Sequence, residues 1–305
     1  MAPRLVAEIA SGLDAIGVDE ATRKALADSR EQLALPFLLV VVGEWNAGKS
    51  AFINALLGAR VLEEGVTPTT SRVGVLQHGE TVARRTRPDG IEETTAPAEI
   101  LKAVAIVDTP GTNAVLREHE ALTRDFLPRA DLVLFVTSAD RPYTESERAF
   151  LEAIREWGKK VVLVLNKADL LETPEDVAKV VAFVREQAGK TLGVPPEVFA
   201  LSAREAQRSR ERGDAAGLER SGLPAFEAKV TATLDEAERF RLKLQSPIGV
   251  ARRAHGEATA LVGQRLDVLQ GDGAAPTAID ERVAAQSAER TPVFPFRLSA
   301  VQTGL

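Results

Sequence analysis

The chain contains no cysteine, which excludes a disulfide framework, a cysteine-ligated zinc site and a thiol nucleophile. Aromatic residues make up only 5% of its 305 residues, and no apolar run reaches the roughly 20 residues that a membrane-spanning helix needs. An excess of positive charge is also absent: the net charge is −6, which argues against a mainly electrostatic nucleic-acid binder. The first residues carry Glu8 and Asp14 and no clean apolar segment, so we expect no secretory signal and a cytoplasmic location.

The apolar residues that are present fall into short runs separated by helical patterns. The run FLLVVV is continuous and β-branched, which is typical of a strand buried on both faces. Runs of this kind occupy residues 37–42, 104–107, 132–136, 161–165 and 198–201. Helical patterns between them occupy residues 51–58, 115–128, 144–157 and 174–190. This alternation predicts an α/β fold with a doubly wound, mostly parallel sheet.

Two other kinds of segment flank this pattern. Residues 73–77 and 81–94, which include a Pro-Asp-Gly turn, predict an antiparallel hairpin at one edge of the sheet. Apolar stripes at helical spacing predict helices before the first strand and over residues 224–270, where we expect Gly271–Pro276 to end the helix. We therefore divide the chain into N-terminal helices (1–33), an α/β domain (34–221) and C-terminal helices (222–305).

A phosphate-binding motif follows the first strand directly. GEWNAGKS, residues 43–50, matches G-x-x-x-x-G-K-[ST] and opens into a helical pattern. The glycines permit a tight bend that turns backbone N–H groups toward a phosphate, and the helix N-terminus adds partial positive charge. Lys49 is expected to reach the β- and γ-phosphates, and Ser50 to bind Mg²⁺. The nucleotide-binding residues predicted here are Glu44, Asn46, Ala47, Gly48, Lys49, Ser50 and Ala51.

Three further strand ends carry polar residues suited to a guanine nucleotide. Asp108 can hold a Mg²⁺-bound water, and Gly111 leaves its amide free for a γ-phosphate. Asp169, in the sequence Asn166-Lys167-Ala168-Asp169, can accept hydrogen bonds from both guanine N1–H and its exocyclic amine, whereas adenine has no such pair of donors on that edge. Lys167 would lie along the base, and Asn166 would tie this segment to the phosphate loop. Ser202 and Ala203 are expected to supply the last guanine contact.

These four elements, in this order, resemble the guanine-nucleotide-binding domain of P-loop GTPases over about residues 37–240. GEWNAGKSAFINALLG, EGVTPTTS, DTPGTN and the later ERFRLKLQSP resemble the bacterial dynamin-like and mitofusin or fuzzy-onion-like branch. The resemblance implies that Thr69 or Thr70, of which we favour Thr70, closes over the γ-phosphate. The implied metal set is then Ser50, Thr70 and, through water, Asp108. It also implies that the helices of residues 1–33 and 222–270 form a neck, and that residues 277–305 begin a trunk.

The resemblance further implies a Mg²⁺-dependent GTPase with Lys49, Asn46 and Thr70 as catalytic residues and a homodimer formed through the G domain. Thr112 stands where many GTPases have a catalytic Gln, so that means of orienting the water is absent. Asn46 stands where K⁺-activated GTPases have an Asn, and it either holds a K⁺ ion or only braces the loop. Trp45 meets a second G domain or covers the nucleotide. We expect lipid contact only through parts absent from this chain, and no nucleic-acid partner.

Two alternatives to a dynamin-like GTPase stay open on the sequence. One is a GTPase of the Era/TrmE type that serves RNA or ribosome maturation, since that class shares the N-x-G-K-S loop. The other is a scaffold that binds GTP and barely hydrolyses it, which the missing Gln suggests. The chain is also either a fragment of a longer protein or a minimal form that acts with a partner.

Overall fold

The computed structural model describes residues 20–31, 35–64, 73–88, 90–109, 126–233 and 236–290. The chain divides into two compact units, Met1–Ala254 and His255–Leu305. The first unit contains a mixed eight-stranded sheet in the order β3-β4-β2-β5-β1-β6-β7-β8. Its strands are β1 (Phe37–Val42), β2 (Gly74–His78), β3 (Ala83–Thr86), β4 (Glu92–Ala96), β5 (Val104–Asp108), β6 (Leu132–Ser138), β7 (Val161–Asn166) and β8 (Glu197–Ala200).

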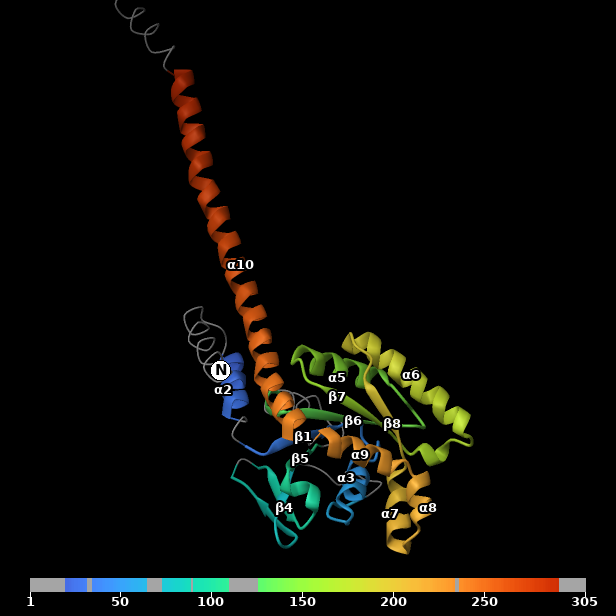
Figure 1. Ribbon diagram of the computed structural model, residues 1–305. Helices are drawn as coiled ribbons and strands as arrows, with labels where there is room; N and C mark the ends of the chain where they lie inside the picture. Colours follow the sequence, from blue (N-terminus) through green and yellow to red (C-terminus); the bar gives the residue numbers. More distant parts are fainter. Residues whose placement is uncertain are drawn as a thin grey trace, which may run out of the picture. The chain divides into compact units, whose positions relative to one another are not determined.

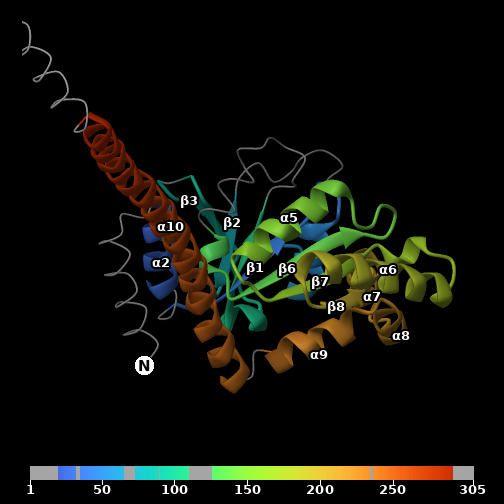
Figure 2. The ribbon, with the colours of Figure 1, turned by 90° about the horizontal axis from the view of Figure 1, so that it is seen from above.

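Helices cover both faces of the sheet (Figure 1). The α-helices are α2 (Glu20–Glu31), α3 (Lys49–Leu57), α5 (Glu145–Glu156), α6 (Pro174–Leu192), α7 (Ala203–Arg212), α8 (Ala215–Arg220), α9 (Leu223–Thr233) and α10 (Glu236–Arg290). Short 3-10 turns are η2 (Glu99–Lys102), η3 (Leu127–Arg129) and η4 (Ala168–Leu170). In Figure 1, helices α5 and α6 lie on one face, and α3, α7 and α9 on the other. Figure 2 shows α5, α6 and α9 from above. The α/β P-loop architecture expected from the sequence is therefore confirmed.

The central strands are apolar because both of their faces are covered. Every residue of β1, β5, β6 and β7 is buried, and β1 pairs in parallel with both β5 and β6. On the α3 face, the ring of Phe226 in α9 lies edge-on to Phe52 of α3 and to Phe199 of β8, with centroids 5.1 and 5.6 Å apart. Helix α9 is thus part of the core of the α/β unit.

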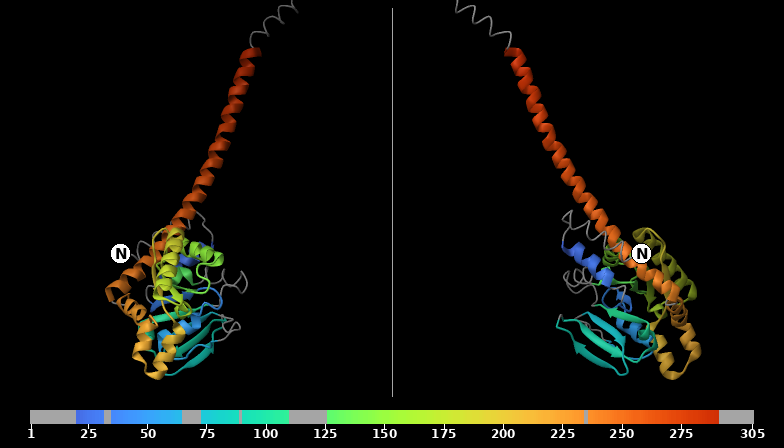
Figure 3. Two further views of the ribbon diagram at one scale, coloured as in Figure 1. Left: turned by 90° about the vertical axis from the view of Figure 1, so that its right-hand side faces the viewer. Right: turned by 60° about the vertical axis from the view of Figure 1, so that its left-hand side comes forward.

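The hairpin at the sheet edge differs in part from the prediction. β3 and β4 pair antiparallel, as residues 81–94 suggest. β2 instead pairs in parallel with β4 and antiparallel with β5. The reason is that β2 takes the inner position against the core, with Leu76 fully buried, whereas all four residues of β3 are exposed. Figure 3 shows β2, β3 and β4 in cyan at this edge from two further sides.

The expected helix end at Gly271–Pro276 is wrong, since α10 continues through these residues to Arg290. Glycine lowers helix propensity by about 1 kcal/mol and proline by about 3 kcal/mol, which weakens a helix without forbidding it. The residues predicted as helical at 224–270 also form two helices, α9 and α10. Most of the predicted helix at 115–128 lies outside the described residues, and so does the predicted helix that precedes α2. The domain limits at 33/34 and 221/222 stay predictions. Among the described residues, no helix has an apolar stretch sufficient to cross a bilayer.

Candidate functional site

The loop between β1 and α3 has a backbone conformation that leaves no room for a side chain at two of its positions. Gly43 and Gly48 have φ values of 149° and 86°. A Cβ atom on Gly43 would lie 2.0 Å from the Val136 carbonyl oxygen, and one on Gly48 would lie 2.3 Å from Nδ2 of Asn166. Asn46 is also left-handed, with φ 62°, a conformation that asparagine tolerates better than most residues. The two glycines therefore let the loop pack closely against β6 and β7.

Lys49 begins α3, and its ammonium group lies across the loop. Nζ donates to the carbonyl oxygens of Gly43 and Glu44, each at 3.0 Å. Burial lowers the pKa of Lys49 to about 8, against the opposing attraction of Asp108 and Glu44. A phosphate adds negative charge at this position and thus favours the protonated lysine.

Asp108 ends β5 next to the loop and is almost fully buried, with 1% of its surface exposed. Its Oδ2 accepts a hydrogen bond from Ser50 Oγ at 3.4 Å, whereas Oδ1 has no hydrogen-bond partner. Burial raises its pKa to about 6, although Lys49, Ser50 and the Thr109 amide each lower it. A buried carboxylate oxygen without a donor, next to a serine hydroxyl, fits the oxygen donors that Mg²⁺ and its waters require. These residues therefore suit the metal that P-loop GTPases generally use.

Asn166, at the end of β7, joins three of the predicted motifs. Its Nδ2 donates to the carbonyl oxygens of Ala47, at 3.0 Å, and Gly48, at 3.3 Å. Its Oδ1 accepts from the backbone amides of Lys167, at 2.8 Å, and Ala203, at 3.1 Å. One buried side chain thus holds the phosphate loop, the base motif and the turn after β8 together.

The remaining residues of the base motif follow Asn166 directly. Lys167 has a left-handed backbone with φ 61°, and its Nζ lies 3.6 Å from Oδ1 of Asp140. Asp169 is exposed in η4, where its carboxylate is accessible to a base. Ser202 is buried and caps α7 by accepting from the Glu205 amide at 3.1 Å. Its hydroxyl is therefore used inside the protein, which leaves backbone groups for a guanine contact.

The structure brings most of the predicted site residues to one end of the sheet. They are Glu44, Asn46, Ala47, Gly48, Lys49, Ser50, Ala51, Asp108, Asn166, Lys167, Asp169, Ser202 and Ala203. Thr69, Thr70 and Gly111 lie outside the described residues, so their roles stay predictions. Asn46 and Trp45 are exposed at the tip of the loop.

Several residues around the loop have contacts that the sequence did not predict. The carboxylate of Glu44 accepts hydrogen bonds from the hydroxyls of Thr144 and Ser146, which are 100 and 102 residues away. Asn54 of α3 accepts from the backbone amides of Val61 and Leu62, at 2.9 and 2.8 Å. The motif Thr144-x-x-Glu147 is typical of a capping box at the start of a helix, but nothing local in the sequence connects it to the phosphate loop.

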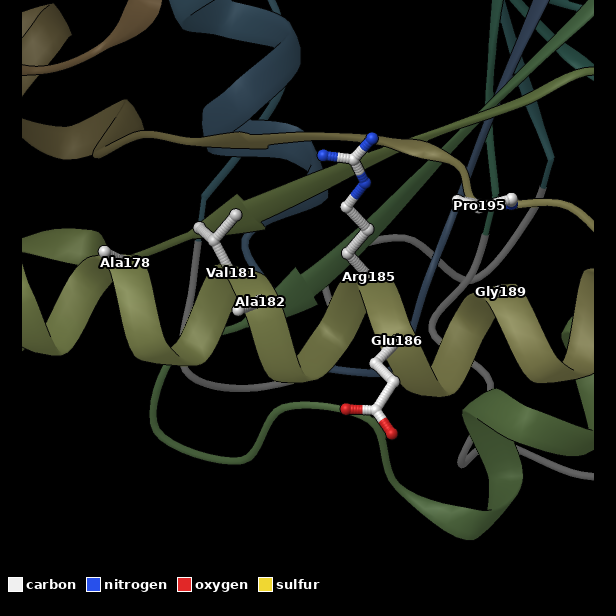
Figure 4. A pocket seen from close by; sticks show the side chains of 7 residues that line it. All are labelled: Ala178, Val181, Ala182, Arg185, Glu186, Gly189 and Pro195. Atoms are coloured by element: carbon white, nitrogen blue, oxygen red, sulfur yellow. The ribbon is translucent and has the colours of Figure 1, made fainter.

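A separate apolar hollow of about 530 Å³ lies along α6 (Figure 4). The residues that line it are Ala178, Val181, Ala182, Arg185, Glu186, Gly189 and Pro195. None of them belongs to the nucleotide motifs. The hollow is thus distinct in its residues from the candidate site.

Comparison with known proteins agrees with this geometry. Residues 38–167 match a family model described as 50S ribosome-binding GTPase. The chain is 40% identical over 263 residues to the probable transmembrane GTPase FZO-like, chloroplastic, of Arabidopsis thaliana, covering 78% of this chain and 29% of that protein. It is 27% identical over 293 residues to the bacterial dynamin-like protein of Nostoc punctiforme, covering 77% and 42%. The chain therefore spans less than half the length of either relative.

A solved structure of an oligomerised bacterial dynamin pair contains a chain with the same fold. It aligns with 98% of this chain and 52% of its own length, with a TM-score of 0.58 and 18% sequence identity. At this identity the likeness establishes the α/β P-loop GTPase fold alone.

Proposed function

This chain belongs to the dynamin-like and FZO-like family of GTPases, and its similarity to these GTPases implies that it hydrolyses GTP. We therefore propose that it converts GTP to GDP and phosphate with bound Mg²⁺. The hydrogen bonds of Asn166 to Ala47, Gly48, Lys167 and Ala203 support this most directly. They hold the groups suited to a phosphate chain and those suited to a guanine base in one rigid arrangement. Phosphoryl transfer depends mainly on such positioning and on charge neutralisation.

Each half of the site has a defined task in this proposal. The amides of the phosphate loop and the Lys49 ammonium hold the β- and γ-phosphates, and Asp169 accepts from the guanine edge. Ser50 and, through water, Asp108 would hold Mg²⁺, together with a threonine from residues 69–70. When bound there, the ion would supply positive charge to offset that of the phosphate oxygens. Asn46 is the candidate ligand for a K⁺ ion that further offsets this charge.

We propose that turnover is slow in the monomer and rises when two G domains pair. Thr112 occupies the position at which many GTPases have a catalytic Gln. Trp45 and Asn46 are exposed at the loop tip, where a second copy can reach them. One solved relative is described as an oligomerised dynamin pair.

Contacts within the first unit support coupling of the nucleotide site to the neck. Lys243 of α10 donates to the carbonyl oxygen of Leu35, and Arg253 lies 2.9 Å from Glu156 and over the Trp157 ring. A movement of the α/β domain therefore acts on this part of α10. We propose that the full-length protein uses the coupling in membrane remodelling, fusion or fission, working from the cytoplasm at the inner membrane surface.

The test is GTP hydrolysis measured against protein concentration, in KCl and in NaCl. We expect the rate per molecule to rise with concentration, and Lys49→Ala to abolish nucleotide binding or turnover. A flat and negligible rate in both salts, with GTP still bound, would favour the scaffold. Specific retention of RNA in a filter-binding assay would favour the Era/TrmE-like alternative.

Base selectivity provides a second test. Asp169→Asn should shift preference from GTP toward XTP, because the amide can donate to the extra carbonyl of xanthine. Competition binding with both nucleotides measures this shift. An Asp169→Asn variant that still selects GTP would contradict the base contact.

A further inference from the structure

Glu44 occupies a position in the phosphate loop at which the motif tolerates any residue. Its side chain is turned into the protein, and only 7% of the residue is exposed. Oε1 accepts hydrogen bonds from the hydroxyls of Thr144 and Ser146. A carboxylate has no favourable contact to make with a phosphate chain, so the role of this charge lies elsewhere.

Burial of a carboxylate is costly unless the group is hydrogen-bonded. Here the two hydroxyls come from the residue that caps α5 and from the first turn of that helix. The N-terminus of a helix carries partial positive charge, which stabilises a nearby anion. The two hydrogen bonds therefore hold the side chain of Glu44 against the start of α5.

The segment that contacts Glu44, at the start of α5, is itself held by several hydrogen bonds. Tyr143 has φ 61°, a conformation that costs a non-glycine residue about 1–3 kcal/mol and persists only where its surroundings impose it. Its hydroxyl donates to the Gln187 carbonyl of α6 at 3.0 Å. Glu147 closes the capping box by accepting from the Thr144 amide at 3.0 Å and from Thr137 Oγ1 at 3.0 Å. The loop between β6 and α5, residues 139–144, is thus held in one conformation by these contacts.

The same β6–α5 loop reaches the base motif. Ser138 donates to Asp140, and Oδ1 of Asp140 lies 3.6 Å from Nζ of Lys167. The Ala139 amide donates to the Asn166 carbonyl oxygen at 2.9 Å. The contacts of Glu44 therefore join the phosphate loop to a segment that also touches the base half of the site.

We propose that Glu44 is a positioning residue, whose carboxylate fixes the phosphate loop to the start of α5 and so holds the loop in its nucleotide-binding shape. The proposal rests on the proposed function, because it assigns a role in binding the same nucleotide. Backbone groups of Glu44 face the loop itself: its carbonyl oxygen accepts from Lys49 Nζ, at 3.0 Å, and from the Ala47 amide, at 3.2 Å. Displacement of Glu44 would disturb both contacts.

The experiment is calorimetric titration of the full chain with Mg·GDP and Mg·IDP. Glu44→Ala removes the oxygen that accepts both hydrogen bonds, and we expect it to weaken GDP binding about tenfold or more, as a displaced binding group does. Glu44→Gln keeps a carbonyl oxygen for the two hydroxyls, so its affinity should stay within about threefold of wild type. The preference for GDP over IDP and the binding stoichiometry should not change, because the base contacts and the folded fraction are retained.

Ser146→Ala tests the contact from the other side, on an exposed residue where alanine favours the helix. We expect about a two- to threefold loss of GDP affinity, and no added loss when it is combined with Glu44→Ala. The control is Glu145→Gln, one residue away and paired with Arg148, which should bind as wild type does. If Glu44→Ala does not fold, Glu44→Gln and Ser146→Ala decide the question.

The outcomes separate the proposal from the function on which it rests. Wild-type protein that binds no guanine nucleotide would overturn both. Wild-type binding with Glu44→Ala and Ser146→Ala both within twofold of it would overturn the positioning role alone. Additive losses in the double variant, or a Glu44→Gln variant as weak as Glu44→Ala, would also overturn it.

Discussion

Two buried pairs of a lysine and an aspartate lie at opposite ends of the parallel strands, and they differ in how fully they are bonded. At the end of β5, Asp108 has one oxygen without a hydrogen-bond partner, and Lys49 donates only to loop carbonyls. At the start of β6, Asp131 accepts from the Leu38 amide at 2.9 Å and lies 4.0 Å from Lys243. Lys159 donates to the Pro128 carbonyl at 2.7 Å.

This difference separates a binding site from a structural junction. Buried polar groups in proteins are almost always hydrogen-bonded, so a buried carboxylate oxygen without a donor indicates a place kept for a ligand. Asp131 instead joins the starts of β1 and β6 to α10, which are elements of the fold itself. A buried aspartate thus has a different role according to whether all of its carboxylate oxygens are hydrogen-bonded within the protein.

The largest expected effect is at the ligand end. Asp108→Asn should reduce GTP hydrolysis about 100-fold or more, because the charge near Mg²⁺ is lost. Its stability should not fall, since a buried charge is removed. Phosphate release under single-turnover conditions measures the first effect, and urea unfolding the second. Hydrolysis within threefold of wild type would contradict the assignment of Asp108.

The opposite pattern is expected at the structural junction. Asp131→Ala leaves the Leu38 amide without its acceptor and removes the negative charge beside Lys243, so the free energy of unfolding should fall by about 3–5 kcal/mol. Urea unfolding measures this loss, and calorimetry should find GDP affinity unchanged in the folded molecules. A loss of stability below about 1 kcal/mol would remove the distinction between the two ends.

A pH dependence should follow from Lys159. Burial lowers its pKa from 10.5 to about 7, so between these values the unfolded chain binds more protons than the folded protein. Stability attributable to Lys159 should therefore increase as pH rises from about 7, by up to about 1.4 kcal/mol per unit. Lys159→Met should lack this increase, while Lys49, with a pKa of about 8, still contributes above pH 8. Parallel slopes for both proteins between pH 7 and 9 would contradict the burial of a neutral Lys159.

The smallest effect is expected where α10 contacts the end of α5. Arg253 lies 4.4 Å from the centre of the Trp157 ring and 2.9 Å from Glu156. Arg253→Ala should lower stability by about 1 kcal/mol, because both contacts are partly exposed. The matched control is Arg252→Ala, on the exposed neighbouring residue. Equal urea midpoints for the two variants would show that the contact contributes nothing measurable.

The sequence predicted the strands at the centre of the sheet well, because continuous β-branched runs such as residues 37–42 have few other stable environments. It also placed the phosphate loop, Asp108 and Asn166, since each stands at the end of such a strand. It was less successful at the sheet edge and in α10. There the inner position of β2, and the continuation of the helix past Gly271, depend on more than local propensity.

The contacts of Glu44 and Asn54 show why part of the site was not predictable. Glu44 meets Thr144 across 100 residues of chain, and no residue pattern near either position specifies that meeting. Asn54 is the one polar residue of α3 after Lys49 and Ser50. Only its hydrogen bonds to residues 61 and 62 show that it organises the segment after α3.

By itself, the sequence determined which residues carry the chemistry and the order in which they stand, because loop, strand and cap conformations depend on neighbours along the chain. Tertiary structure alone decided which of those residues meet, as with Asn166 and the carbonyls of Ala47 and Gly48, or Glu44 and Ser146. The physical reason is that such contacts depend on the packing of strands and helices far apart in sequence. A small change in that packing moves a hydrogen-bonding atom out of reach without altering any local pattern.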